Sequence, residues 1–155
     1  MLADHSIMMG LKIMLEVVLT LNAVWFAMGF HAFCIRRKLF AKVVVPNKDH
    51  RDNSAYLAVI ETGRFMGGFN LALAILNLLL VLNIGDFEKN NQWAVLLVFN
   101  ALAHGSQFAA NVPIAVLNCR GEGVWNVFRG VMLRIFVIDF TLMLINAMAV
   151  VMLFF

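Results

Sequence analysis

An aspartate and a histidine stand in long apolar stretches of this chain. Asp139 and His104 are each flanked mainly by aliphatic, aromatic and small residues. A carboxylate in the middle of a bilayer costs about 2.5–3.5 kcal/mol on insertion scales, so we expect Asp139 to be paired, protonated or functional. With a rise of about 1.5 Å per helical residue, both side chains lie at the same depth. Such a pair can transfer a proton, polarise a hydroxyl group or bind a polar head group, and a structural hydrogen bond explains it equally well.

A second pair of ionisable residues lies near the start of another apolar stretch. Glu61 and Arg64 are three residues apart, which is the spacing of an ion pair along one helix face. The simplest interpretation is a structural ion pair at the membrane interface. The functional interpretation is an anchor for an anionic lipid head group, because a guanidinium offers forked donors to a phosphate or carboxylate.

Small and amide residues recur at helical spacing in all four apolar stretches. Polar groups avoid lipid and small residues allow close helix contact, so we expect these stripes to face the protein interior. Among them, Asn70, Asn100 and Gln107 are also candidate contacts for a lipid or ligand, although helix packing alone explains each one. The stripes comprise Glu16, Thr20, Ala23 and Ala27; Gly63, Gly67, Asn70, Ala74 and Asn77; Asn100, His104, Gln107 and Asn111; and Asp139 with Asn146.

The histidines and cysteines do not form a pattern typical of a metal or haem site. His31 and His104 lie within apolar stretches but at different depths, so they do not face each other as paired ligands would. Cys34 and Cys119 are predicted at the cytoplasmic ends of their stretches, where thiols stay reduced. We therefore predict no metal and no cofactor.

Composition and hydropathy indicate the elements that must position these residues. Of 155 residues, 63% are apolar and 14% are charged, which is too few charges to cover a water-soluble domain. A bilayer span needs about 20 mostly apolar helical residues. Four windows satisfy this, at about 7–34, 56–84, 93–117 and 124–155, joined by a polar loop over 35–55 and two short links. The sequence predicts one all-α domain over 1–155, an integral membrane four-helix bundle with antiparallel neighbours.

The basic residues predict the orientation of these spans. Ten of the twelve Lys and Arg residues fall in or near the first and third loops, and only Lys12 and Lys89 lie at the opposite end. Because cytoplasmic loops are enriched in Lys and Arg, we expect both termini on the non-cytoplasmic side. The net charge of +3 thus reflects topology, and we expect no nucleic-acid partner. A bacterial inner membrane is the predicted location, with the endoplasmic reticulum membrane as the alternative.

Two segments of residues 55–112 resemble a known family of membrane proteins. The segments are Arg64-Phe-Met-Gly67-Gly-Phe-Asn-Leu and Ala101-Leu-Ala-His104-Gly-Ser-Gln107-Phe. They are similar to the ergosterol-biosynthesis scaffold family, and the broader DoxX-like group has a similar Arg-plus-Gly start to its second helix. This resemblance implies four helices and a tether or accessory subunit without chemistry of its own. Asp139 has no counterpart in that family.

A weaker similarity is to the eicosanoid and glutathione membrane family, which also has four spans and a basic first loop. That family has Glu, Arg and Asn near the start of its second helix. The present chain lacks the family's second Arg in that helix. It also lacks the Glu that follows the family's Asn, since Leu73 stands three residues after Asn70. Glutathione binding is therefore a minor interpretation.

These observations predict a non-catalytic accessory or scaffold subunit, with membrane lipids and other integral membrane subunits as its partners. The alternative is a small enzyme or binding protein for a lipophilic molecule. In that alternative, Asp139 and His104 form an acid–base pair, and Glu61 with Arg64 anchors a head group. A conduit for protons or small solutes along the polar stripes ranks third.

Overall fold

The computed structural model contains helices and no strands over residues 2–87 and 89–155, which are the residues it describes, and its side chains are described over 8–87 and 89–155. Four of its helices are long and apolar enough to cross a membrane, as expected for a multi-pass integral membrane protein. This part of the prediction is confirmed. The elements are α1 (Leu2–Phe30), a π-helical turn (His31–Ile35), α2 (Arg37–Val44), a 3₁₀ turn (Lys48–His50), α3 (Ser54–Leu82), α4 (Asn90–Cys119) and α5 (Gly130–Met152).

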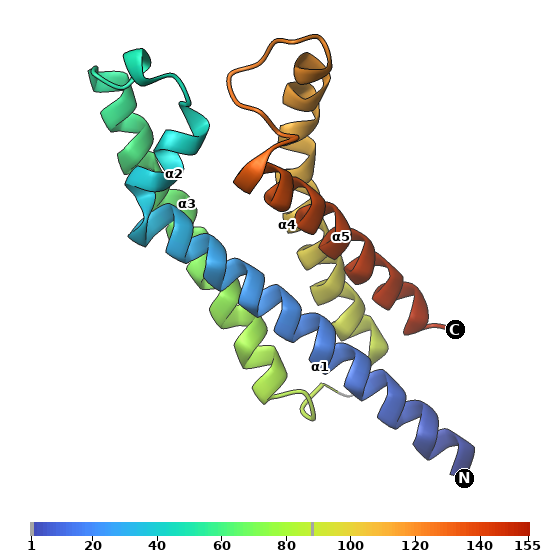
Figure 1. The fold of residues 1–155 in the computed structure, drawn as a ribbon. Coiled ribbons are helices and arrows are strands. Elements are labelled where there is room, and N and C mark those ends of the chain that lie inside the picture. Colours follow the sequence, from blue (N-terminus) through green and yellow to red (C-terminus); the bar gives the residue numbers. More distant parts are fainter. Residues whose placement is uncertain (1, 88) are drawn as a thin grey trace.

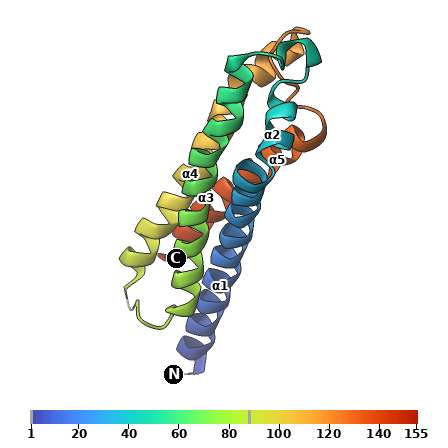
Figure 2. The same cartoon turned by 90° about the vertical axis from the view of Figure 1, so that its left-hand side faces the viewer.

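The long helices form two hairpins that meet at one end of the molecule. Helix α1 packs mainly on α3, and α4 packs mainly on α5, while α1 and α5 provide contact between the pairs. Figure 1 shows both termini and the α3–α4 connection toward one end, which we call the termini end. The hairpins diverge toward the other end, which holds α2 and the α4–α5 loop and which we call the basic-loop end. A view turned by 90° shows the molecule as elongated (Figure 2).

An apolar cluster joins the two hairpins near the termini end. Leu19 and Leu97 have no exposed surface, and Ala149 is 2% exposed. These residues come from α1, α4 and α5, and Leu80 of α3 belongs to the same cluster. Burial of aliphatic side chains from all four long helices fixes the hairpins together at this end.

The stripe of small residues on α3 is buried, as predicted. Gly63, Gly67, Asn70, Ala74 and Asn77 all face inward. At Gly67 an added Cβ would lie 2.6 Å from the Cβ and 2.9 Å from the backbone nitrogen of Cys34. The glycines therefore allow the backbone of α3 to approach the π-helical turn that ends α1, which is the role of small residues in membrane helix packing.

The stripe expected to face inward on the first helix, Glu16, Thr20, Ala23 and Ala27, is wrong at two of its four positions. Thr20 and Ala27 are exposed, whereas Leu19, Asn22 and Phe26 of α1 are completely buried. The predicted stripe was chosen for small and polar residues. The buried face of α1 is instead mainly large and apolar, with one amide in it.

The fourth span begins later than predicted, at Gly130 rather than at 124. Residues 124–129 form a loop that the side chain of Asn118 holds in place. Its Nδ2 donates to the carbonyl of Trp125 (2.9 Å) and its Oδ1 accepts from the amide of Val127 (2.8 Å). Gly123 at φ 115° and Gly130 at φ 59° adopt backbone conformations that favour glycine. The apolar residues of this loop extended the hydropathy signal beyond the helix.

The predicted loop over 35–55 contains the short helix α2. Ala41 is completely buried against Tyr56 and Ile60 of α3, so α2 lies against the start of that helix. The basic residues of the segment had dominated the sequence pattern and concealed this packing face.

Candidate functional site

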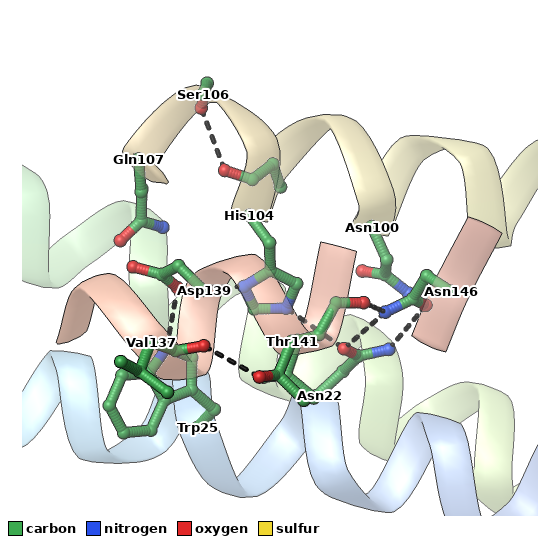
Figure 3. A network of polar contacts seen from close by, with 12 residues as sticks. Asn22, Trp25, Asn100, His104, Ser106, Gln107, Val137, Asp139, Thr141 and Asn146 are labelled. Carbon is green, nitrogen blue, oxygen red and sulfur yellow. Dashed lines mark hydrogen bonds and ion pairs between the residues drawn. The ribbon is translucent and has the colours of Figure 1, made fainter. Parts of the chain in front are cut away.

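His104 and Asp139 meet in a buried polar network at the junction of the two hairpins (Figure 3). The Nδ1 of His104 lies 3.1 Å from the Oδ1 of Asp139, and its Nε2 lies 3.0 Å from the Oδ1 of Asn22. Asn22 also exchanges hydrogen bonds with Asn146 of α5, at 2.9 and 3.0 Å. The network therefore joins α1, α4 and α5, and it contains the predicted Asp–His pair.

Burial and stacking hold the imidazole in one orientation. Asn22, His104, Asp139 and Asn146 have no exposed surface. The ring of Phe26 stacks on the imidazole, with centroids 4.6 Å apart and an interplanar angle of 10°. Stacking on Phe26 and the contacts at both nitrogens together prevent the imidazole ring from turning, so Nδ1 stays next to Asp139 and Nε2 next to Asn22.

Trp25 is a member of the network that the sequence analysis did not identify. Its indole Nε1 donates to the Oδ1 of Asp139 over 2.8 Å. Among the described residues the other carboxylate oxygen, Oδ2, is buried without a hydrogen-bond partner. In Figure 3 the side chain of Gln107 extends from α4 toward this carboxylate. The sequence did not indicate a polar role for Trp25, because hydropathy does not distinguish a tryptophan from the other residues of an apolar stretch.

A second amide pair joins α3 to α4. The Nδ2 of Asn100 donates to the Oδ1 of Asn77 over 2.9 Å, and the reciprocal bond is 3.1 Å. Asn77 also donates to the carbonyl of Leu73 in its own helix. Asn100 therefore has a packing role here, although it was a candidate ligand contact.

Removing one partner of this pair leaves the other without a bond across the hairpins. We expect Asn100→Leu to lower the apparent free energy of unfolding in detergent by about 0.6–1.7 kcal/mol, the range measured for interhelical polar contacts. The double variant Asn77→Leu with Asn100→Leu should recover part of this loss, because neither amide is then left unpaired. Thermal or denaturant unfolding in one detergent measures both values. Equal losses in the single and double variants would contradict the expectation.

The remaining predicted site residues lie apart from the network. Asn70 donates to the carbonyl of Met66 in its own helix and lies against Gly29, where an added Cβ would collide with the Asn70 Oδ1. Glu61 and Arg64 form the predicted ion pair, at 2.6 Å, on an exposed face of α3. Arg37 adds a longer contact to Glu61, at 3.5 Å.

Apolar cavities open between the hairpins on the basic-loop side of the network. Their volumes are about 590, 200 and 370 Å³, and Ile135 lines all three. We refer to them together as the cleft. The first lies between the end of α1, α2 and the start of α5, the second reaches inward beside the network, and the third lies between α2, α3, α4 and α5. The second cavity is lined by Trp25, Met28, Gly29, Ala32, Phe33, Asn70, Gln107, Val131, Arg134, Ile135 and Ile138.

Two guanidinium groups from opposite hairpins line this cleft. Arg36 lies at the end of the π-helical turn and lines the first cavity together with His31. Arg134 lies one turn into α5 and lines the second cavity. Neither arginine makes an ion pair with another residue that the structure describes. The cleft thus combines apolar walls with two cations that are available to an anion.

The residues that could ligate a metal do not gather at this site. Over residues 8–87 and 89–155, whose side chains the structure describes, no group of three or more His, Cys, Asp or Glu residues could hold a metal ion. The arrangement offers a mostly apolar cleft with two cationic side chains and, beside it, a buried acid–base pair.

Comparison with protein-family models, with curated proteins and with solved structures finds no match to this chain.

Proposed function

We propose that the protein binds an amphiphilic molecule with an anionic head group in the cleft between its hairpins. The observation that carries this proposal is the pair Arg36 and Arg134 on the walls of a mostly apolar cleft, since neither has an ionic partner among the residues that the structure describes. In this arrangement the acyl or isoprenoid chain lies between the hairpins, and the head group lies between the two guanidiniums.

The dimensions of the cleft support this proposal. Binding sites for small molecules have volumes of about 300–1,000 Å³ and are mostly apolar, with a few polar groups that orient the ligand. The first cavity alone, at about 590 Å³, falls in this range. The two cavities that hold the arginines also share Met28, Ala32, Val131 and Ile135, so one ligand can extend through both.

The proposed topology places the cleft in the leaflet where anionic lipids are available. With the basic-loop end on the cytoplasmic side, according to the distribution of Lys and Arg, the cleft opens in the cytoplasmic leaflet. That leaflet is rich in anionic lipids. Membrane lipids are therefore the ligands with which we propose to test the site.

Binding, rather than catalysis, is the role that the position of the acid–base pair favours. His104 and Asp139 have no exposed surface and do not line the second cavity, whereas Trp25, which donates to Asp139, does line it. A ligand in the cleft contacts Trp25 and Gln107 before it reaches the pair. We therefore assign no catalytic residue.

Removal of both arginines tests the proposal. We expect Arg36→Gln with Arg134→Gln to weaken the binding of dioleoyl-phosphatidylglycerol at least about tenfold, because each guanidinium supplies charge-assisted hydrogen bonds to the phosphate. Binding of dioleoyl-phosphatidylcholine should change less. Affinities are measured in detergent with the purified chain, by native mass spectrometry or by quenching with brominated lipid.

The matched control is Arg64→Gln with Arg120→Gln, which removes the same charge from positions that do not line the cleft. Its affinity should stay within about twofold of the original chain, a difference of under about 0.5 kcal/mol. A loss confined to the control would instead assign the anchor to Glu61 and Arg64. A stoichiometric membrane protein that occupies the cleft and excludes lipid would support the accessory-subunit role in place of lipid binding.

A further inference from the structure

The polar network also determines how many protons its ionisable pair holds, which is a property beyond ligand binding in the cleft. A backbone carbonyl fixes the orientation of the first amide in this network. The Nδ2 of Asn146 donates to the carbonyl of Leu142 over 2.8 Å, and this carbonyl can only accept. The amide of Asn146 is thereby fixed, with Nδ2 toward Leu142 and Oδ1 toward Asn22.

The orientation of Asn146 determines that of the Asn22 amide, which in turn determines the protonation of His104 Nε2. Asn146 Nδ2 donates its second hydrogen to Asn22 Oδ1, and Asn22 Nδ2 donates in return to Asn146 Oδ1. Turning the Asn22 amide over would bring two NH₂ groups together. The atom 3.0 Å from His104 Nε2 is therefore a carbonyl oxygen, which only accepts, so Nε2 carries a hydrogen.

The other ring nitrogen must share a second proton with Asp139. Nδ1 and the carboxylate Oδ1 are 3.1 Å apart, and two lone pairs cannot face each other at this distance without repulsion. One proton lies between them. It is held either by Nδ1, giving imidazolium and carboxylate, or by Oδ1, giving neutral imidazole and carboxylic acid. Both descriptions contain the same number of protons, and the pair has no net charge.

Among the side chains that the structure describes, the hydrogen-bond and stacking partners of the pair carry no ionisable group. Helix α1 presents Asn22, Trp25 and the ring of Phe26 to it, and Asn146 of α5 bonds to Asn22. The nearest charged residues along these helices are Glu16, six residues before Asn22, and Arg134, five residues before Asp139. They are about 9 and 7.5 Å away along the helix axes. A net charge on the buried pair would thus lack a close counter-charge.

We propose that His104 and Asp139 form a proton-binding site that holds one exchangeable proton and exchanges it with water only through the cleft. On the termini side, Leu19, Leu97 and Ala149 belong to an apolar cluster and have almost no exposed surface. On the basic-loop side, Trp25 and Gln107 line the second cavity and lie next to Asp139 (Figure 3). When the proton leaves, it passes to water in the cleft, and a net negative charge stays on the pair. Access from one side only makes this a proton-binding site and not the conduit ranked third from the sequence.

Nitrogen-15 spectra of the histidine ring test the proton count. The other three histidines, His5, His31 and His50, are replaced by Gln, so that labelled histidine reports only on His104 in the full chain. At neutral pH we expect Nε2 to give the signal of a protonated nitrogen and Nδ1 to show a coupled proton shared with Asp139. In Asp139→Asn the Nδ1 signal should move to that of an unprotonated nitrogen. An unprotonated Nε2 in the chain with Asp139 intact overturns the proposal, whatever the variant does.

Proton exchange with water tests the route. We expect Gln107→Leu to slow exchange of the shared proton at least about tenfold, because it replaces a polar side chain that lines the second cavity and extends toward Asp139. The matched control is Ser106→Leu, an exposed neighbour on the same helix, which should leave the exchange rate unchanged. Equal rates in both variants and the original chain overturn the proposed access through the cleft.

Discussion

Asp139→Asn is expected to lower the apparent free energy of unfolding by about 1–3 kcal/mol, the usual effect of leaving a buried polar group without its partner. Asp139 Oδ1 has two partners at once: it accepts from the indole N–H of Trp25 and it shares a proton with His104 Nδ1. An asparagine cannot replace both. With its oxygen toward the two groups, it requires a buried imidazolium without a counter-charge. With its NH₂ there, it faces the indole N–H, and two donors meet.

A second substitution is expected to recover part of the loss. Trp25→Phe removes the indole N–H, so that an asparagine at 139 can turn its NH₂ toward an unprotonated His104 Nδ1 without opposing a donor. The double variant Trp25→Phe with Asp139→Asn should therefore be more stable than the sum of the two single losses predicts. We expect a coupling free energy of about 1 kcal/mol, in the range found for residues of one network. Denaturant or thermal unfolding of all four chains in one detergent gives this value.

Additive losses in this cycle would contradict the hydrogen-bond assignment, because they would mean that Trp25 and Asp139 act independently. The Trp25→Phe single variant serves as the internal control, since it accounts for the change in packing volume. Phe is smaller than Trp, so some loss from packing is expected in both chains that carry it and cancels in the coupling term.

The parts of the fold that depend on local pattern could be predicted from the sequence. Hydropathy located the first three spans to within a few residues, because the length of a membrane helix is set by the bilayer. The Glu61–Arg64 pair depends only on spacing within one helix. Counting depth along the helices brought His104 and Asp139 to one level, because the helices cross the same thickness in alternating directions.

The parts that depend on how the hairpins are placed could not be predicted in this way. The cleft results from the divergence of the two hairpins, which hydropathy and spacing do not encode. Arg36 and Arg134 belong to the basic residues from which the sequence predicts topology, and the structure brings them to the walls of one cleft. Trp25 was missed because its polar atom is a single N–H on an apolar ring. The buried face of α1 was misassigned because size and polarity do not distinguish packing against protein from packing against lipid.

Close contact between α3 and the π-helical turn that ends α1 makes Gly67 sensitive to substitution. Gly67→Ala places a Cβ 2.6 Å from the Cβ of Cys34 and 2.9 Å from its backbone nitrogen. A flexible side chain could move aside, but the backbone of the π-helical turn cannot do so without moving α1. We therefore expect a loss of about 1–3 kcal/mol in the apparent free energy of unfolding, the usual cost of overpacking.

The neighbouring glycine provides the matched control. A Cβ at Gly68 meets nothing within 4 Å, on the same helix and one residue away. Both substitutions gain about 1 kcal/mol from the higher helix propensity of Ala, so this gain cancels in the comparison. Gly68→Ala should be neutral or stabilising, whereas Gly67→Ala should be destabilised and should unfold at a lower temperature. If the two variants are equally stable in one detergent, α3 does not contact the end of α1 as closely as described. Because the position of Arg36 follows that of the turn, the Arg36 wall of the cleft depends on this contact as well.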